Sequence, residues 1–93
     1  MYKVALAHRA KKNLKHLEKS GNFNKGALGE LITLLMRGEA LPAKYRDHAL
    51  KGNLERIREC HLAFDVLVAY ENSPEIELVT IIAIGSHQDL FKN

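Results

Sequence analysis

The sequence predicts an α+β domain whose elements run β-α-α-β-β-β, with a helical hairpin packed on one face of an antiparallel-rich sheet. The chain begins with a short alternating segment, continues with two segments whose apolar residues recur at helical spacing, and ends with three strand-like segments. Because 93 residues are enough for one hydrophobic core and too few for two, we expect a single domain spanning residues 1–93.

The first strand is expected at residues 2–6, where apolar side chains alternate with charged or small ones. The first helix is expected from His8 to Lys19, because its apolar residues recur at helical spacing among lysines. Gly21 follows it, and glycine is the usual residue just past a helix end. His8 and His16 belong to this segment, and we interpret them as surface or helix-start residues.

A second helix is expected from about Asn24 to Arg37, with one apolar stripe made of Leu28, Leu31, Ile32, Leu35 and Met36. Gly38 marks its end. Gly26 and Gly29 weaken the helix propensity by about 1 kcal/mol each, so packing must hold this helix. We expect the two glycines to allow a close approach of the first helix.

Residues 39–53 are expected to form a long, basic loop interrupted by Pro42 and Gly52, and loops of this length are often functional. Three strands are then expected, at residues 54–62, 64–70 and 76–84. The last is almost continuously apolar, as in a strand covered on both faces. Asn72-Ser73-Pro74 supplies a turn, so the last two strands should form an antiparallel hairpin.

The single cysteine, Cys60, excludes an intrachain disulfide and is consistent with a reducing compartment. It lies within an apolar strand pattern, which favours a buried, inert thiol over a nucleophile. No apolar run is long enough to cross a bilayer, and the first residues have no cleavable signal. We therefore expect a cytoplasmic protein with no membrane partner.

The formal net charge of +3 is unevenly distributed along the chain. Basic residues dominate residues 1–26 and 37–58, whereas residues 71–91 contain neither lysine nor arginine. This asymmetry favours a polyanionic partner. A solvated, lysine-rich helix face would produce the same pattern, so charge alone does not decide between the two.

Four side chains are expected together on the side of the sheet that the helices leave open: His48, His61, Asp65 and His87. His61 is near the end of one strand and Asp65 is at the start of the next, so antiparallel pairing brings them together. His87 follows the last strand, and strand pairing alone does not place it near the others.

These residues suggest either a metal site or acid–base catalysis. The histidine spacings match no metal-ligand motif and there is no cysteine cluster, so neither a metal nor another cofactor is expected. Histidine can accept or donate a proton near neutral pH. RNA carries its own nucleophile, the 2′-hydroxyl, and a basic side chain such as Lys51 or Arg58 would bind the phosphate.

Four segments of the chain resemble the RelE superfamily of toxins from type II toxin–antitoxin systems, and within it the YafQ branch. They are residues 41–52 (LPAKYRDHALKG), residues 58–62 (RECHL), Asp65 with the strand to Tyr70, and residues 85–91 (GSHQDLF). The resemblance implies a RelE-like fold and a ribosome-dependent endoribonuclease that cleaves messenger RNA. It also implies a cognate antitoxin that neutralises the toxin and represses the operon with it, so operator DNA would be contacted only through that complex.

By position, the resemblance implies catalytic or RNA-contacting roles for His48, His61, Asp65 and His87. His87 would donate the proton to the leaving 5′-oxygen. Asp65 and His61, with His48, would activate the 2′-hydroxyl or hold the charged network in place. We assign RNA and phosphate binding to Arg46, Lys51, Arg58 and Phe91, with Phe91 stacking on a base.

Three positions depart from the family pattern: Ala83 stands in place of an arginine, Val66 of a tryptophan and Ala49 of a proline. Ala83 removes a phosphate clamp, so Arg46, Lys51 or Arg58 would have to supply the positive charge. An alternative is therefore a toxin-fold protein with little or no nuclease activity, which serves as an antitoxin-binding co-repressor. A gyrase-poisoning relative is a third hypothesis, and the histidine set argues against it.

Overall fold

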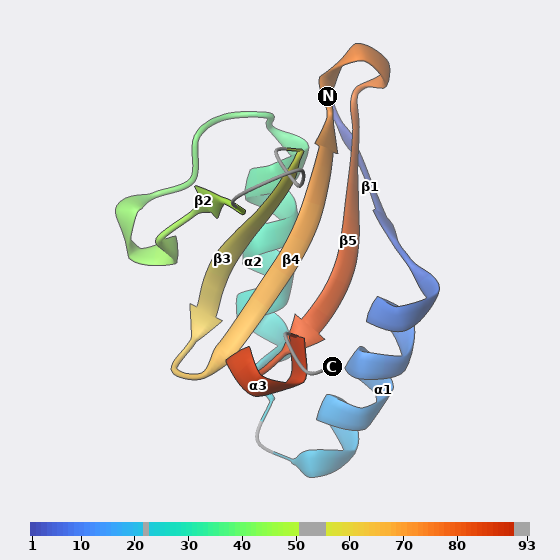
Figure 1. The fold of residues 1–93 in the computed structure, drawn as a ribbon, viewed down its shortest axis with the longest axis vertical. Coiled ribbons are helices and arrows are strands. Elements are labelled where there is room, and N and C mark those ends of the chain that lie inside the picture. Colours follow the sequence, from blue (N-terminus) through green and yellow to red (C-terminus); the bar gives the residue numbers. More distant parts are fainter. Residues whose placement is uncertain (22, 51–55, 91–93) are drawn as a thin grey trace.

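The computed structural model describes residues 1–21, 23–50 and 56–90, which form a five-stranded sheet with helices on both faces (Figure 1). The strands are β1 (Lys3–Leu6), β2 (His48–Ala49), β3 (Ile57–Ala63), β4 (Val66–Ser73) and β5 (Leu78–Gly85). Their order across the sheet is β1-β5-β4-β3-β2. β1 runs parallel to β5, and the other neighbouring pairs are antiparallel.

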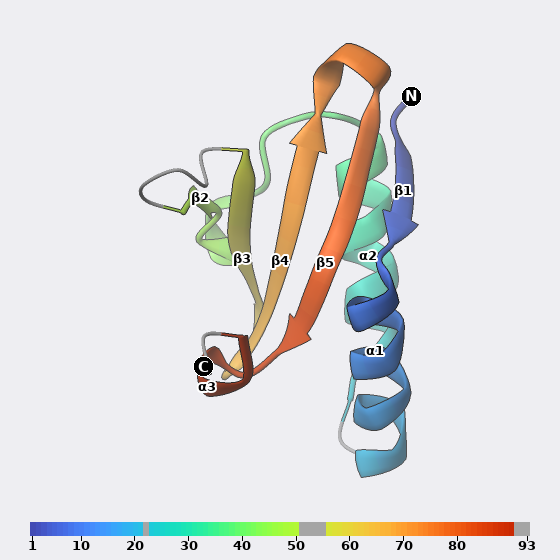
Figure 2. The same cartoon turned by 45° about the vertical axis from the view of Figure 1, so that its right-hand side comes forward.

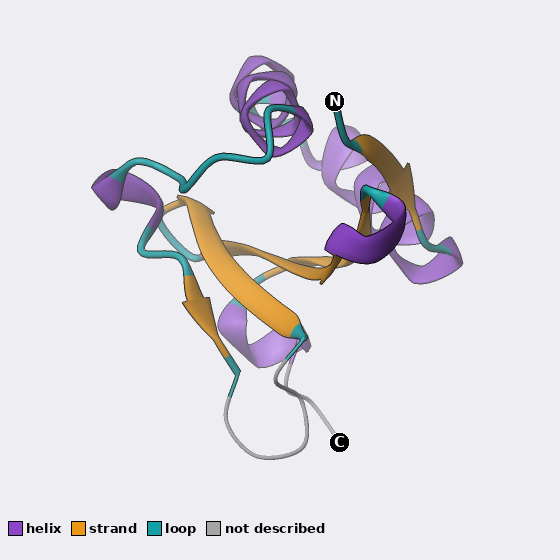
Figure 3. Cartoon of the chain, turned by 90° about the horizontal axis from the view of Figure 1, so that it is seen from above, coloured by secondary structure: helices purple, strands orange, loops and turns teal. Residues whose placement is uncertain are grey.

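Helices α1 (His8–Ser20) and α2 (Lys25–Met36) lie on one face of this sheet (Figure 2). The short helix α3 (His87–Leu90) lies on the opposite side, at the end where β5 stops (Figure 3). We call the sheet face opposite α1 and α2 the open face. It is the face that can accommodate a site.

The hydrophobic core fills the space between the sheet and the two long helices. Helix α2 contributes Leu28, Leu31 and Leu35 at helical spacing, and α1 contributes the fully buried Ala10. The sheet contributes Cys60, Val68, Tyr70, Val79, Ile81 and Ile84. Because side chains alternate between the two faces of a regular strand, Glu59, His61 and Ala69 point to the open face. In β5 a register shift between Ile81 and Ala83 interrupts the alternation, and Ala83 is placed on the open face by its pairing with Ala69. None of the described helices is long and apolar enough to cross a membrane.

The predicted α+β fold is confirmed, with two main helices packed on a largely antiparallel sheet. Two short elements, β2 and α3, were not predicted, because stretches of two and four residues show no periodicity. The strand predicted at residues 64–70 begins later, at Val66. Phe64 and Asp65 instead form the turn after β3, where Asp65 takes a φ of 56°.

The expected role of Gly26 and Gly29 in a close helix–helix contact is wrong. A Cβ at Gly29 would meet nothing within 4 Å, and one at Gly26 would meet only the side chain of Asn24, at 3.2 Å. Gly38 differs, because its φ is 69° and a Cβ there would lie 2.7 Å from the ring of Tyr2. The close approach in this region is therefore between Gly38 and Tyr2.

Gly29→Ala should raise the free energy of unfolding by about 0.5–1 kcal/mol, because alanine favours the helix and its methyl group meets no other atom. Gly38→Ala is the matched control and should lower it, because φ is left-handed and the methyl group would strike Tyr2. Denaturant unfolding measures both changes. A destabilised Gly29→Ala protein would contradict this packing of α2.

Candidate active site

A row of side chains crosses the open face from the edge of the sheet toward its centre. Its Cα partners are His48 with Glu59, Glu59 with Ala69, and Ala69 with Ala83. Partnered residues on neighbouring strands place their side chains on the same face. The row therefore sets an imidazole and a carboxylate side by side, next to two buried alanines.

A second row lies closer to α3 and consists of His61, Leu67 and Gly85. Neighbouring strands are spaced by about 4.8 Å, so the Cα atoms of His61 and Gly85 lie about 10 Å apart. His87 begins α3 two residues after Gly85. His61 thus shares the open face with Glu59, and His87 belongs to the helix over the same end of the sheet.

Glu59 is the sole buried charged residue in the described part of the chain, with 4% of its surface exposed. Its Oε1 lies 3.6 Å from Nε2 of His48, which is an ion-pair distance rather than a hydrogen bond. Its Oε2 is buried and has no hydrogen-bond partner among the described residues. Such an oxygen costs at least about 1–3 kcal/mol of stability, so folding alone does not account for this carboxylate.

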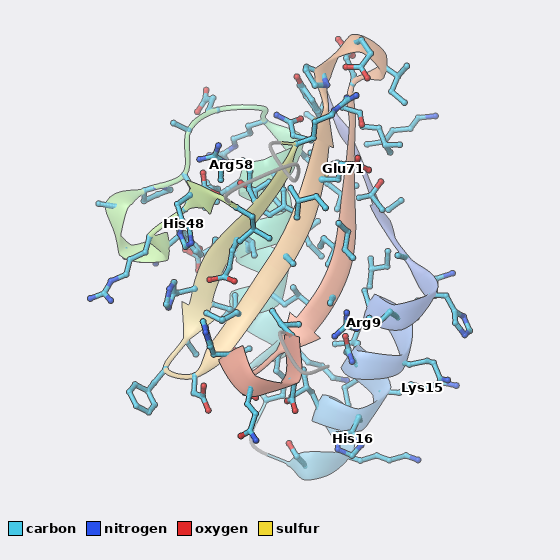
Figure 4. The ribbon with its side chains drawn as sticks, in the orientation of Figure 1. Arg9, Lys15, His16, His48, Arg58 and Glu71 are labelled. Carbon is cyan, nitrogen blue, oxygen red and sulfur yellow. The ribbon has the colours of Figure 1, made fainter. Side chains whose placement is uncertain are left out.

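The ring of His48 is oriented through its other nitrogen. Nδ1 lies 2.9 Å from the carbonyl oxygen of Arg46, and since a carbonyl can only accept, Nδ1 carries the hydrogen. Nε2 then presents to Glu59 either a proton or a lone pair. The His48 side chain extends from β2 beside β3 (Figure 4) and is 51% exposed, so a substrate can reach it.

Asp65 and His87 lie at the same end of the open face. Asp65 is exposed at the tip of the hairpin between β3 and β4, in the left-handed region that aspartate tolerates. Helix α3 begins with a reciprocal cap: the amide of Ser86 donates to Asp89 Oδ2 at 3.2 Å, and the amide of Asp89 donates to Ser86 Oγ at 3.0 Å. This cap fixes the backbone around His87, whose side chain is exposed.

The predicted phosphate-binding residues are placed differently from one another. Arg58 faces the helix side, where its Nε and Nη2 atoms lie 3.0 and 2.9 Å from Asp47 Oδ2. Its hydrogen bond to Asp47 raises the pKa of Arg58, and its charge is directed at Asp47 rather than at the open face. Arg46 is exposed two residues before His48. Lys51 and Phe91 lie outside the described residues.

A sequence model described as "Bacterial toxin of type II toxin-antitoxin system, YafQ" matches residues 2–92. The chain belongs to this family. Comparison with curated protein sequences finds no match.

Solved structures with the YafQ-family fold are similar over almost the whole chain. A metal-bound toxin from Helicobacter pylori is 34% identical with a TM-score of 0.89, and the match covers 98% of this chain and 100% of that one. A chain of the E. coli DinJ-YafQ complex is 26% identical with a TM-score of 0.85, covering 98% and 99%. The solution structure of HP0892 from Helicobacter pylori is 34% identical with a TM-score of 0.75, covering 98% and 100%.

The departures from the YafQ pattern lie in distinct surroundings. Ala83 is 2% exposed and lies in the same row as Glu59, two strands away, or about 10 Å between Cα atoms. An arginine at this position would extend along the row toward the unpaired Oε2. Val66 packs against the core, and Ala49 is exposed on β2. Of the three, only position 83 lies in the row that contains Glu59.

Glu59 was missed by sequence reasoning, although its position held a usable signal. It lies two residues before His61 in a predicted strand, and residues two apart in a strand point to the same face. A strand that places a histidine on the open face therefore places Glu59 there as well. What the sequence could not show is that this carboxylate is buried.

On the core side of β3, the predicted burial of Cys60 is confirmed. Burial raises the pKa of its thiol to about 12, and the carboxylates of Asp47 and Glu59 add to the shift. Burial also raises the pKa of Tyr70, whose hydroxyl donates a hydrogen bond to Asp47. Both groups are therefore held in the neutral form by the fold.

The free energy of unfolding should fall as the pH rises above about 9. In the unfolded chain these groups ionise near pH 8.5 (cysteine) and about 10 (tyrosine), while the folded protein keeps both neutral to higher pH, so their stabilisation is lost over this range. Cys60→Ala should make the decline shallower, because it removes one of the two contributions. Denaturant titrations at several pH values measure this, and an equally steep decline in Cys60→Ala would contradict the raised thiol pKa.

Proposed function

We propose that this YafQ-family chain is an endoribonuclease toxin, which cleaves messenger RNA on the ribosome by metal-independent acid–base catalysis. Family membership and the uncovered sheet face with its histidines support the proposal. The observation that carries it is the unpaired, buried Oε2 of Glu59 beside His48. A buried polar atom without a hydrogen-bond partner calls for an explanation, and a functional role is one.

In the proposed mechanism, the RNA 2′-hydroxyl donates a hydrogen bond to Oε2 of Glu59, which has no partner among residues 1–21, 23–50 and 56–90. The Glu59–His48 pair removes the hydroxyl proton, and the 2′-oxygen attacks the phosphorus atom. The bond from phosphorus to the 5′-oxygen breaks, and His87 gives that oxygen a proton. The products are a 2′,3′-cyclic phosphate and a 5′-hydroxyl. Each positioned acid or base contributes about 10²–10⁴-fold to the rate.

The remaining predicted residues have supporting roles in this proposal. His61 shares the open face with Glu59, and with Asp65 it would hold the charged network at this end of the sheet. Arg46 is exposed near His48, and with Lys51 it would bind phosphate oxygens. Phe91 would stack on a base. Arg58 is paired with Asp47, so its contribution would be indirect.

The proposal includes a cognate antitoxin, the ribosome and its messenger RNA as partners. The E. coli relative is solved as the DinJ-YafQ complex. In the present chain, Lys15 extends from the basic helix α1 (Figure 4), a surface suited to ribosomal RNA or to an acidic antitoxin segment. Arg9 of the same helix instead donates a hydrogen bond to the backbone oxygen of Asp89, at 3.1 Å. Operator DNA would be contacted through the antitoxin complex.

A second candidate is a toxin-fold protein with little nuclease activity, which acts as an antitoxin-binding co-repressor. Ala83 is the observation that favours it, because the row that contains Glu59 and His48 has neither lysine nor arginine. A phosphate approaching this row would meet a carboxylate without a fixed cation beside it. The two candidates differ in whether RNA is cut.

Glu59→Gln should lower the cleavage rate by about 10²–10⁴-fold, because the amide cannot accept the hydroxyl proton. Its unfolding free energy should not fall, because the change removes a buried charge of the same shape. His87→Ala should slow cleavage similarly without unfolding the protein. The assay is cleavage of ribosome-bound messenger RNA, read by primer extension and by analysis of the product ends, with Gly29→Ala as a folding control that keeps full activity.

Full activity in Glu59→Gln would remove this carboxylate from the mechanism. The same assay in the presence of EDTA tests metal independence. A relative from Helicobacter pylori is described as metal-bound, whereas the described residues of this chain contain no cluster of three or more potential metal ligands. Loss of cleavage on chelation, with recovery on adding a divalent metal, would overturn the metal-free mechanism.

Ala83→Arg should raise the cleavage rate, because the guanidinium would extend toward Glu59 and stabilise the charge that develops on the phosphate. Ala83→Met is the size control, since it adds bulk at the same buried position without charge. Comparing the cleavage rates of both variants with that of the unsubstituted chain tests whether a positive charge at position 83 raises the rate. An unchanged rate in Ala83→Arg would show that other cations, such as Arg46 or Lys51, already bind the phosphate.

A further inference from the structure

Asp47 precedes His48 and uses both of its carboxylate oxygens on the helix side of the sheet. Oδ2 accepts from Nε of Arg58 at 3.0 Å and lies 2.9 Å from Nη2 of the same residue. Oδ1 accepts a hydrogen bond from the hydroxyl of Tyr70. The Asp47 side chain is 18% exposed, so water screens these contacts only partly. We call Asp47, Arg58 and Tyr70 the clasp.

The clasp joins the loop before β2 to two inner strands. Arg58 belongs to β3, and Tyr70 is a core residue of β4. β2 itself is only two residues long, so its own ladder with β3 holds it weakly. The clasp therefore adds side-chain contacts to the backbone pairing that holds the edge of the sheet. Tyr45, buried in the core, fixes the chain on the other side of Arg46.

This anchoring explains the unusual backbone between the two fixed points. Arg46 takes a φ of 48°, which costs a residue with a side chain roughly 1 kcal/mol. In this conformation its carbonyl oxygen accepts the hydrogen bond from Nδ1 of His48. A strained residue persists where the surrounding structure fixes its neighbours. Here Tyr45 is fixed by burial in the core, and Asp47 by its contacts with Arg58 and Tyr70.

Asp47 and His48 are successive residues entering a strand, so their side chains point to opposite faces. The carboxylate of Asp47 is held on the helix side of the sheet. The imidazole of His48 lies on the open face, where its Nε2 is the nitrogen nearest to Glu59. We propose that Asp47 is a positioning residue, which through Arg58 and Tyr70 fixes residues 46–48 and so holds His48 in the Nδ1–H tautomer against Glu59. The expected effect of Asp47 on cleavage rests on the proposed function, whereas its effect on the tautomer of His48 does not depend on that function.

The test is Asp47→Asn, which keeps the shape of the side chain and removes the charge that holds Arg58. The ¹⁵N chemical shifts of the His48 ring report its tautomer without any need for activity. The unsubstituted protein should show a protonated Nδ1, and Asp47→Asn should show a mixture of the two tautomers. Tyr70→Phe, which removes one of the hydrogen bonds, should change the shifts less. An unchanged tautomer in Asp47→Asn would overturn the proposal.

Glu75→Gln is the matched control. It breaks another arginine–carboxylate contact, between Arg56, just before β3, and Glu75, whose side chains are 53% and 58% exposed. This variant should leave the ring shifts of His48 and the cleavage rate unchanged. A change in His48 as large as that in Asp47→Asn would show that loss of any neighbouring arginine–carboxylate contact suffices, and would overturn a specific role for Asp47.

Cleavage then tests whether Asp47 acts through His48. Asp47→Asn should lower the rate by up to about 10²-fold, the effect of misplacing a reacting group by roughly 1 Å. Added to His48→Ala, it should cause little further loss, because the group it positions is already gone. Independent, multiplying losses would overturn the proposal. If the unsubstituted chain does not cut RNA, the proposed function fails, while the ring shifts still decide whether the clasp orients His48.

Discussion

The alternation of side chains along β3 is the constraint on which both the core and the site depend. Cys60 is fully buried and faces the helices, so Glu59 and His61 must face the other way. A shift of one residue would move Glu59 into the core and Cys60 out of it. The register that packs the core is therefore the same register that assembles the row with His48.

The site is built at a cost that the rest of the fold has to offset. A buried carboxylate oxygen without a partner, a left-handed Arg46 and a left-handed Asp65 are each unfavourable by themselves. They occur within or beside the strands that carry the catalytic candidates, while the core between sheet and helices consists of well-buried side chains such as Leu31, Val68 and Ile81. Left-handed backbone is not confined to this region, because Glu77, in the turn before β5, also has a φ of 50°.

The order and type of the long elements could be predicted from the sequence, because the two helices have apolar residues at helical spacing and the last strands are rich in apolar, β-prone residues. The arrangement of the candidate site was harder to predict from the sequence. His61 and Asp65 could be assigned to the same hairpin, because they are only four residues apart in the sequence. The partnering of His48 with Glu59 depends on β2, a two-residue strand without a pattern of its own. Arg58 was predicted to bind phosphate because of its charge. Its ion pair with Asp47 could not be predicted, because it forms only when the loop before β2 packs against the sheet.

Under the proposed function, alanine at position 83 changes the role that falls to the histidines. In the two rows that cross the open face, the charged and titratable groups are His48, Glu59 and His61. With alanine at position 83, these rows hold no permanent cation, so a phosphate bound there would be neutralised by protonated imidazoles or by loop residues. The same rings that exchange protons would then also balance charge. If His48 both transfers protons and balances the phosphate charge, the nitrogen that faces Glu59 must be the correct one. The orientation of His48 by Asp47 is then more important here than in a site where an arginine at position 83 balances part of that charge.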